Sequence, residues 1–216
     1  MIDLHTHSLL SDGELLPAEL ARRAAVAGYK TIGISDHVDH TNIEYVVNAI
    51  LKLREKITYQ EGITILPGVE ITHVPERFIK DIICLARKLG ILYVVVHGET
   101  IAEPVEEGTN RAAIEGGADI IAHPGIIKEE DAILAKERGV CLEITSRKEH
   151  SLTNGHVGKI AKKTGAKLVF NTDSHTYSDL ITEYDAKRIV KGAGLSEEDF
   201  YIMQNNADEI AKRVIR

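Results

Sequence analysis

Seven short runs rich in isoleucine and valine alternate with longer segments of helical periodicity along this 216-residue chain. Such alternation is typical of βα units, in which helices connect parallel strands and cover the sheet. The pattern predicts an α/β fold, and the length suits one domain over residues 1–216. We expect strands at residues 2–7, 31–37, 63–72, 91–99, 118–124, 140–146 and 167–175. We expect helices at residues 15–28, 44–60, 76–89, 109–115, 129–138, 152–164, 178–191, 196–204 and 206–215.

Charge and hydrophobicity restrict the possible partners. The formal net charge of −7 argues against nucleic acid as the main partner, because phosphate contacts need clustered Lys and Arg. Bound divalent cations would offset several of these negative charges. The longest strongly apolar run, residues 91–96, is far too short to cross a bilayer, and no signal peptide is readable. We expect a cytoplasmic protein with no membrane partner, and its oligomeric state is unknown.

The two cysteines, Cys84 and Cys141, stand in apolar segments without CxxC spacing. We expect buried free thiols in a reducing compartment rather than a disulfide framework.

Ionisable residues stand near the end of every expected strand. In parallel α/β folds, sites form at these carboxyl ends. One histidine at such a position is more often a hydrogen-bonded structural residue than a ligand. Six of the ten histidines occur there, however, and burying so many polar groups without partners is costly. A divalent metal would supply the partner. The residues are His5, His7, Asp36, His37, Glu70, His97, His123, Glu143, Asp173 and His175.

The spacing of the first two histidines supports a metal site. Residues i and i+2 of a strand project to the same face, so His5 and His7 can reach one ion. The same geometry applies to Asp173 and His175, and a carboxylate such as Glu70 can bridge two ions. A donor set of His, Asp and Glu without Cys suits Zn²⁺, Mn²⁺ or Fe ions.

The ordered motifs HTHS, SDG, SDH, GVE, VVVHGE, AHPG, LEIT and NTDSH resemble the PHP family, named for polymerase and histidinol phosphatase domains. The resemblance runs from Asp3 to His175. It implies a distorted seven-stranded (β/α) barrel, similar to a TIM barrel. The mouth of that barrel, at the C-terminal ends of the strands, would hold two or three divalent ions. Members of the family usually hydrolyse phosphoesters at this site.

The resemblance also implies a set of ligands. One ion would be held by His5, His7, Glu70 and Asp173, with Glu70 bridging to a second ion at His97 and His123. A third ion would be held by His37, His175 and Asp12. Some trinuclear members have a histidine where this chain has Asp12, which has the alternative role of a helix N-cap.

Two further carboxylates, Glu143 and Asp36, are expected to brace the ligand imidazoles rather than bind metal. The expected reaction needs no nucleophilic Ser or Cys. A metal-bound hydroxide between the first two ions would attack phosphorus in line, and a third ion or a cationic side chain would stabilise the phosphoryl oxygens.

Substrate contacts are expected from the loop after the sixth strand, which carries Arg147, Lys148 and His150, and from His73. Arg147 is the best candidate for a phosphate clamp, because its planar fork can bond two oxygens. The alternative is that Arg147 and Lys148 are solvated loop charges while Ser151 caps the next helix. The acidic segment 97–110 could act as a lid and would disfavour a long polyanion.

The leading hypothesis is a metal-dependent phosphoesterase acting on a small phosphorylated substrate, with histidinol phosphate as one candidate. A nuclease or phosphodiesterase is an alternative. So is an amidohydrolase-type enzyme, although such enzymes usually bridge their metals with a carbamylated Lys where this chain has His97. A non-catalytic subunit of an RNA-processing complex is disfavoured, because such relatives tend to be basic and to lack the ligands.

Overall fold

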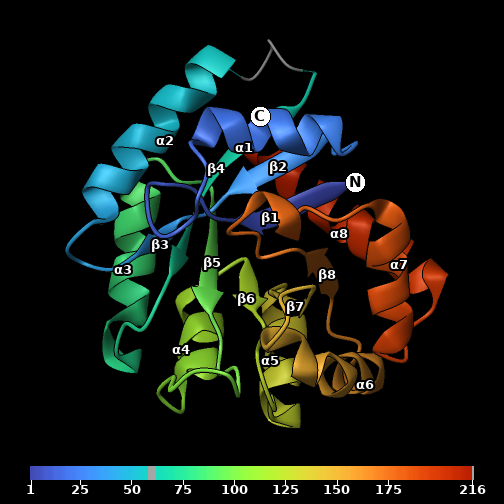
Figure 1. Ribbon diagram of the computed structural model, residues 1–216. Coiled ribbons are helices and arrows are strands. Elements are labelled where there is room, and N and C mark those ends of the chain that lie inside the picture. The colour runs from blue at the N-terminus through green and yellow to red at the C-terminus, as the bar shows by residue number, and fades with distance from the viewer. Residues whose placement is uncertain (58–61, 216) are drawn as a thin grey trace.

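Parallel pairing joins the strands into one sheet in the order β1-β2-β4-β5-β6-β7-β8, and β3 pairs with β4 (Figure 1). A computed structural model provides this description for residues 1–57 and 62–215. The strands are β1 Ile2–Thr6, β2 Thr31–Ile34, β3 His37–Val38, β4 Thr64–Ile71, β5 Tyr93–His97, β6 Ile120–Ala122, β7 Cys141–Thr145 and β8 Leu168–Asn171.

The sheet curls until its two edge strands, β1 and β8, meet. The His7 backbone N–H donates to the Ser174 carbonyl at 2.8 Å, and the Asp173 N–H donates to the His5 carbonyl at 2.9 Å. Pairing there is otherwise sparse, and the β1–β2 register shifts between Asp3 and Thr6. The predicted distorted seven-stranded barrel is therefore confirmed, with the two-residue β3 as an addition.

Helices follow the strands and cover the outside of the barrel (Figure 1). They are α1 Pro17–Val26, α2 Ile43–Ile57, α3 Glu76–Lys88, α4 Thr109–Gly116, α5 Glu129–Arg138, α6 Asn154–Thr164, α7 Glu183–Gly192 and α8 Glu197–Ile215. Two short 3₁₀ helices precede α6 and α7, at His150–Thr153 and Tyr177–Asp179. The predicted end of the second helix, residue 60, lies outside the described residues.

The barrel interior is filled by alternate residues of the strands. Tyr93 and Val95 of β5 and Leu66 of β4 are fully buried in this inner core. Two glycines make room for the Tyr93 ring, because a Cβ atom at Gly68 would lie 2.2 Å from Tyr93 Cζ, and one at Gly33 would lie 2.2 Å from its hydroxyl. The sequence pattern thus leaves space for one large aromatic ring inside a narrow barrel.

The last helix, α8, closes the inner core. Its Ala207, Ile210 and Ala211 belong to the same buried cluster as Tyr93. Two separate helices predicted over 196–204 and 206–215 are wrong, because α8 runs through both ranges without a break. Asn206, at the predicted break, is buried and its side-chain amide donates to the Leu168 carbonyl at 2.7 Å. This tertiary hydrogen bond fixes the helix to β8.

The cysteine prediction is half right. Cys141 is buried at the start of β7, and burial raises the pKa of its thiol to about 12. Cys84 is exposed, so its predicted burial is wrong. The buried face of α3 carries Ile82, Ile83 and Ala86, and Cys84 points away from this face, as expected from the helical period.

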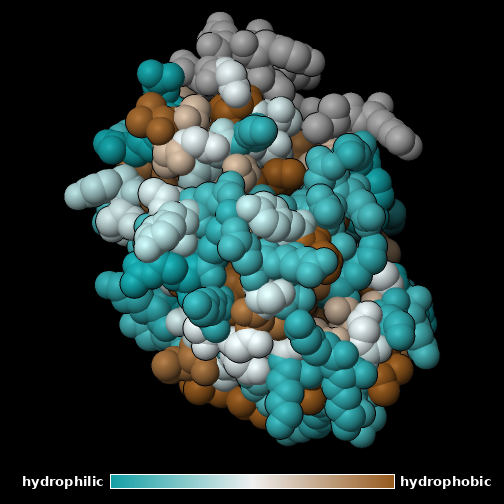
Figure 2. Space-filling model, turned by 90° about the vertical axis from the view of Figure 1, so that its right-hand side faces the viewer, coloured by the Kyte–Doolittle hydropathy of each residue, from teal (hydrophilic) through white to brown (hydrophobic). Residues whose placement is uncertain are grey.

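The described surface is largely polar on the face shown in Figure 2, where the hydrophobic side chains occur in small separate groups. Among residues 1–57 and 62–215, no helix combines the length and the hydrophobicity that a membrane span requires.

Candidate metal centre

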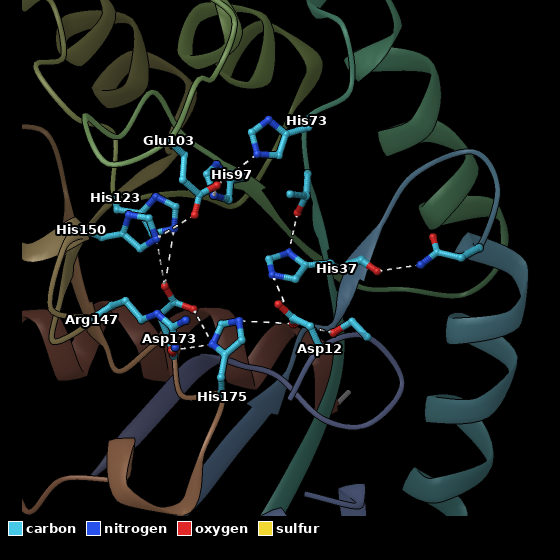
Figure 3. Close-up of a pocket in the computed structure, with 13 residues that line it drawn as sticks. Asp12, His37, His73, His97, Glu103, His123, Arg147, His150, Asp173 and His175 are labelled. Carbon is cyan, nitrogen blue, oxygen red and sulfur yellow. Dashed lines mark hydrogen bonds and ion pairs between the residues drawn. The ribbon is translucent and has the colours of Figure 1, made fainter. Parts of the chain in front are cut away.

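The carboxyl ends of the strands surround a pocket of about 370 Å³. Figure 3 shows side chains from several strand ends pointing toward one another around this pocket. The pocket is lined by Ser11, Asp12, His37, Asn42, Thr72, His73, His97, Glu103, His123, Arg147, His150, Asp173 and His175.

Strand alternation places the donors at the mouth. Tyr93 and Val95 fill the barrel, and His97 follows on the same face at the end of β5. His123 and Asp173 follow β6 and β8 with φ angles of 28° and 52°. The left-handed region is uncommon for residues other than glycine, and strain of this kind is concentrated at functional sites.

The deepest donors form two overlapping groups. His5, His7 and Glu70 place one ligating atom each within 4.8 Å of one another, and so do His5, His123 and Asp173. All five residues are buried. These are the residues expected to hold the first ion, together with His123 from the second.

Three more groups lie nearer the opening. His7, Asp12, His37 and His175 form one group within the same 4.8 Å limit. In it, the His7 ring stacks between those of His37 and His175, at centroid distances of 4.2 and 4.1 Å. The second such group consists of His97, His123 and His150. The third consists of His73, His97 and Glu103. The structure therefore brings together all nine predicted ligands and adds His73, Glu103 and His150.

Buried partners fix the direction of the donor rings. Glu143 Oε1 lies 2.8 Å from His5 Nδ1, and Glu143 Oε2 accepts from the His123 backbone N–H at 3.0 Å. Glu143 thus lies where a bracing carboxylate was expected. Asp36 differs, because it accepts hydrogen bonds from Ser8 and Ser11 and so holds the turn that leads to Asp12.

Burial and neighbouring charges shift the pKa values of several side chains in the pocket. Burial raises the pKa of Asp173 to about 7, although His5 opposes this shift. Burial and the nearby His97 lower the pKa of His150 to about 4. The hydrogen bond from His97 lowers the pKa of Glu103 to about 2. A divalent cation in the cluster would favour ionised carboxylates and neutral imidazoles, which are the forms that bind metal.

A second, independent observation supports metal binding by these donors. Nine buried side-chain nitrogen and oxygen atoms of the described residues have no hydrogen-bond partner. Six belong to predicted ligands: His5 Nε2, both ring nitrogens of His7, both carboxylate oxygens of Glu70, and His123 Nδ1. Several of these atoms face one another, as His5 Nε2 and Glu70 Oε1 do at 3.3 Å. Burying them without hydrogen bonds is costly, and metal coordination would satisfy them.

The predicted substrate contacts separate into two kinds. Arg147, His150 and His73 line the central pocket, whereas exposed Lys148 lines a neighbouring hollow. His73 adopts a φ angle of 52°, and its Nε2 lies 3.1 Å from Glu103 Oε2.

The two capping alternatives are wrong. Helix α1 begins at Pro17 with Leu16 at its N-cap, so Asp12 does not cap it. Helix α6 has Thr153 at its N-cap, and the Ser151 hydroxyl donates to the Lys148 carbonyl instead.

Sequence reasoning missed Glu103. Its carboxylate lies 3.3 Å from His97 Nε2 and 3.5 Å from His150 Nε2, in addition to its contact with His73. Glu103 is one of four glutamates in the loop after β5, and loops have no periodicity that would single one out. The acidic composition of the predicted lid was the available signal.

Comparison with known proteins identifies relatives along most of the chain. The family model described as PHP domain matches residues 3–195. Protein MJ1295 of Methanocaldococcus jannaschii is 43% identical over 215 residues, covering 98% of this chain and 99% of the relative. A probable phosphatase of Clostridium botulinum is 27% identical over 232 residues, covering 98% of this chain and 93% of the relative.

Solved structures share the fold at low sequence identity. A chain in the structure of archaeal ribonuclease P with mature tRNA aligns with a TM-score of 0.73 at 15% identity, covering 97% of this chain and 90% of that chain. The putative histidinol phosphatase hisK of Listeria monocytogenes aligns with a TM-score of 0.62 at 14% identity, covering 86% of this chain and 99% of that chain. Both support the barrel architecture.

Proposed function

The chain belongs to the PHP domain family, and we propose that it is a metal-dependent phosphoesterase that hydrolyses a small phosphorylated molecule. The observation that carries the proposal is the convergence of imidazole and carboxylate donors on one pocket, several of them buried without hydrogen-bond partners. A relative named as a probable phosphatase supports the reaction class.

The proposal includes two or three divalent ions of zinc, manganese or iron. When bound, they would supply a nucleophile at neutral pH and positive charge that polarises a phosphoryl group. Their ligands would be His5, His7, Glu70 and Asp173 for the first ion, Glu70, His97 and His123 for the second, and Asp12, His37 and His175 for the third.

Arg147 binds the phosphoryl oxygens in this proposal. Its guanidinium lines the pocket, where Nη1 lies 3.4 Å from the Asp173 carbonyl oxygen and 3.8 Å from Asp179 Oδ2. The contact with the carbonyl holds the planar fork beside the donor cluster, and a guanidinium can bond two phosphoryl oxygens at once.

The dimensions and charge of the opening favour a small substrate over nucleic acid. The pocket measures about 370 Å³, which suits a small molecule. The loop after β5 adds Glu103 at the pocket and the exposed Glu106 and Glu107 nearby in sequence. A long polyanion would be repelled there, and the net charge of −7 acts in the same direction.

The first experiment combines elemental analysis of the purified protein with a substrate panel of phosphomonoesters, phosphodiesters and amides, with and without Mn²⁺. We expect bound divalent metal and turnover of monoesters. Turnover of diesters alone would favour a nuclease, and turnover of amides an amidohydrolase. Protein that takes up no metal and hydrolyses none of these compounds would refute the proposal.

Two variants test the assigned roles. We expect His97→Ala to abolish turnover while the circular dichroism spectrum is unchanged, and we expect Arg147→Ala to raise KM or lower kcat for phosphorylated substrates. Matched controls are His40→Ala and Arg188→Ala, which alter exposed residues outside the pocket. Normal activity and metal content in His97→Ala would rule out the second ion. An unchanged kcat/KM in Arg147→Ala would show that Arg147 does not contact the substrate.

A further inference from the structure

His150 lies inside the donor cluster although it is not one of the nine residues assigned to metal above. It is buried at the start of the 3₁₀ helix that follows β7. Its ring stacks on His123 at a centroid distance of 4.1 Å with an interplanar angle of 19°, and it lies edge-on to His97 at 5.8 Å. One ligating atom of each of these three histidines lies within 4.8 Å of the others.

Hydrogen bonding orients two of these rings, those of His150 and His97. His150 Nδ1 lies 2.8 Å from the hydroxyl oxygen of Thr100, a buried residue on the loop after β5. His97 Nδ1 lies 3.2 Å from the Gly98 carbonyl oxygen. When Nδ1 donates to such an oxygen, Nε2 is left with a lone pair, and protein ligands are commonly oriented toward metal in this way.

Two carboxylates lie close to the His150 imidazole. Glu103 Oε1 lies 3.5 Å from His150 Nε2, and Asp173 Oδ2 lies 4.0 Å from the same atom. These negative charges favour a cation at the His150 nitrogen and disfavour the oxygens of a phosphate there. A donor set of three imidazoles suits Zn²⁺ and similar ions, whereas Mg²⁺ prefers oxygen ligands.

We infer that His150 is a metal ligand that completes a three-imidazole site with His97 and His123, and that Thr100 positions it. This replaces the substrate contact that the sequence predicted for His150. The inference rests on the proposed function only in that both place divalent metal at the mouth of the barrel. It further implies that this site selects Zn²⁺ over Mg²⁺.

Metal binding, measured without substrate, tests the inference. The protein is stripped with a chelator and titrated with Zn²⁺ against a chromogenic competitor, and with Co²⁺, whose visible absorption reports nitrogen ligation. We expect His150→Ala to weaken one Zn²⁺ site at least tenfold and to reduce the Co²⁺ absorption of that site. Thr100→Val keeps the side-chain shape but loses the hydroxyl, and we expect it to weaken the same site about 10-fold or more.

His40→Ala is the matched control, since His40 is exposed and lies outside the pocket, and its Zn²⁺ affinity should equal that of the wild type. Unchanged Zn²⁺ affinity and stoichiometry in both His150→Ala and Thr100→Val would overturn the inference. If His150→Ala fails to fold, an unchanged Zn²⁺ affinity in Thr100→Val overturns it alone. An affinity loss in a protein that hydrolyses no phosphoester would support the inference while refuting the proposed function. Unchanged metal binding in His150→Ala, together with a raised KM for a phosphoester, would refute the inference while supporting the proposed function.

Discussion

A single buried carboxylate, Glu143, holds two of the proposed ligands in place. Its Oε1 contacts His5 Nδ1 and accepts from Asn171 Nδ2 at 2.7 Å, while its Oε2 accepts from the His123 N–H. Glu143→Gln keeps the shape, but its amide NH₂ must face one of these donors. We expect a 10- to 100-fold loss of Zn²⁺ affinity, measured by chelator competition, with an unchanged circular dichroism spectrum.

The exposed Glu149→Gln in the following loop is the matched control, because it makes the same chemical change outside the donor cluster. Equal Zn²⁺ affinity in Glu143→Gln and Glu149→Gln would mean that His5 and His123 keep their positions without Glu143.

Strand geometry explains why donors at strand ends could be predicted, whereas Glu103 and Thr100 could not. His97 and Glu70 were recognisable because a strand fixes the direction of its last inward residue. Glu103 and Thr100 lie on a loop, whose path depends on contacts distant in sequence, such as Thr100 with His150. Lys148 also lies on a loop, and its side chain lines a hollow beside the central pocket.

At the scale of the element, the start of α8 carries a reciprocal cap. The Asp199 N–H donates to Ser196 Oγ at 3.1 Å, and Asp199 Oδ2 accepts from the Ser196 N–H at 2.7 Å. Burial raises the pKa of Asp199, but Lys162 and Ser196 outweigh it, and the net pKa lies below the usual value of 3.8. The folded state therefore favours the ionised carboxylate.

We expect Asp199→Ala to lower the free energy of unfolding by about 1 kcal/mol at pH 7, measured by urea denaturation. Because the pKa of Asp199 is lower in the folded state, the ionic part of this stabilisation is present above pH 3.8 and disappears as the pH falls through the folded value. Asp208→Ala on the same helix removes only a surface pair with Lys212 and should have a smaller effect. An equal loss of stability in the two variants would contradict the role of the cap.

The βα alternation predicted most elements within a few residues, because buried strands and amphipathic helices have distinct periods. The errors occurred where tertiary contacts determine whether a helix or strand forms and where it ends. Two helices were predicted over 196–204 and 206–215, yet α8 runs through both ranges, and the buried side chain of Asn206 within it donates a hydrogen bond to β8. The two-residue β3 has no period of its own and exists only because it pairs with β4.

At the scale of the whole molecule, the barrel is secured differently at its two ends. Apolar residues of α8 close the inner core at one end, whereas polar donors crowd the other. The buried carboxylates Glu70 and Asp173 and their neighbouring imidazoles are costly to hold together without a cation between them. Divalent metal at this end would therefore contribute to the stability of the barrel as well as to its chemistry.

Metal removal tests this consequence. The donors come from strands that are far apart in sequence, so an ion that binds them binds only the folded chain. Such a ligand stabilises by about 2.7 kcal/mol at a concentration of 100 times Kd. Because about 1 kcal/mol corresponds to about 2–4 °C in a protein of this size, we expect EDTA to lower the Tm of the metal-loaded protein by about 5–10 °C in calorimetry. Added Zn²⁺ should restore the Tm.

The double variant His97→Ala/His123→Ala, which lacks two donors, is the control, and its Tm should fall less on chelation. An identical Tm before and after verified removal of the metal would show that the polar end of the barrel is stable without cations.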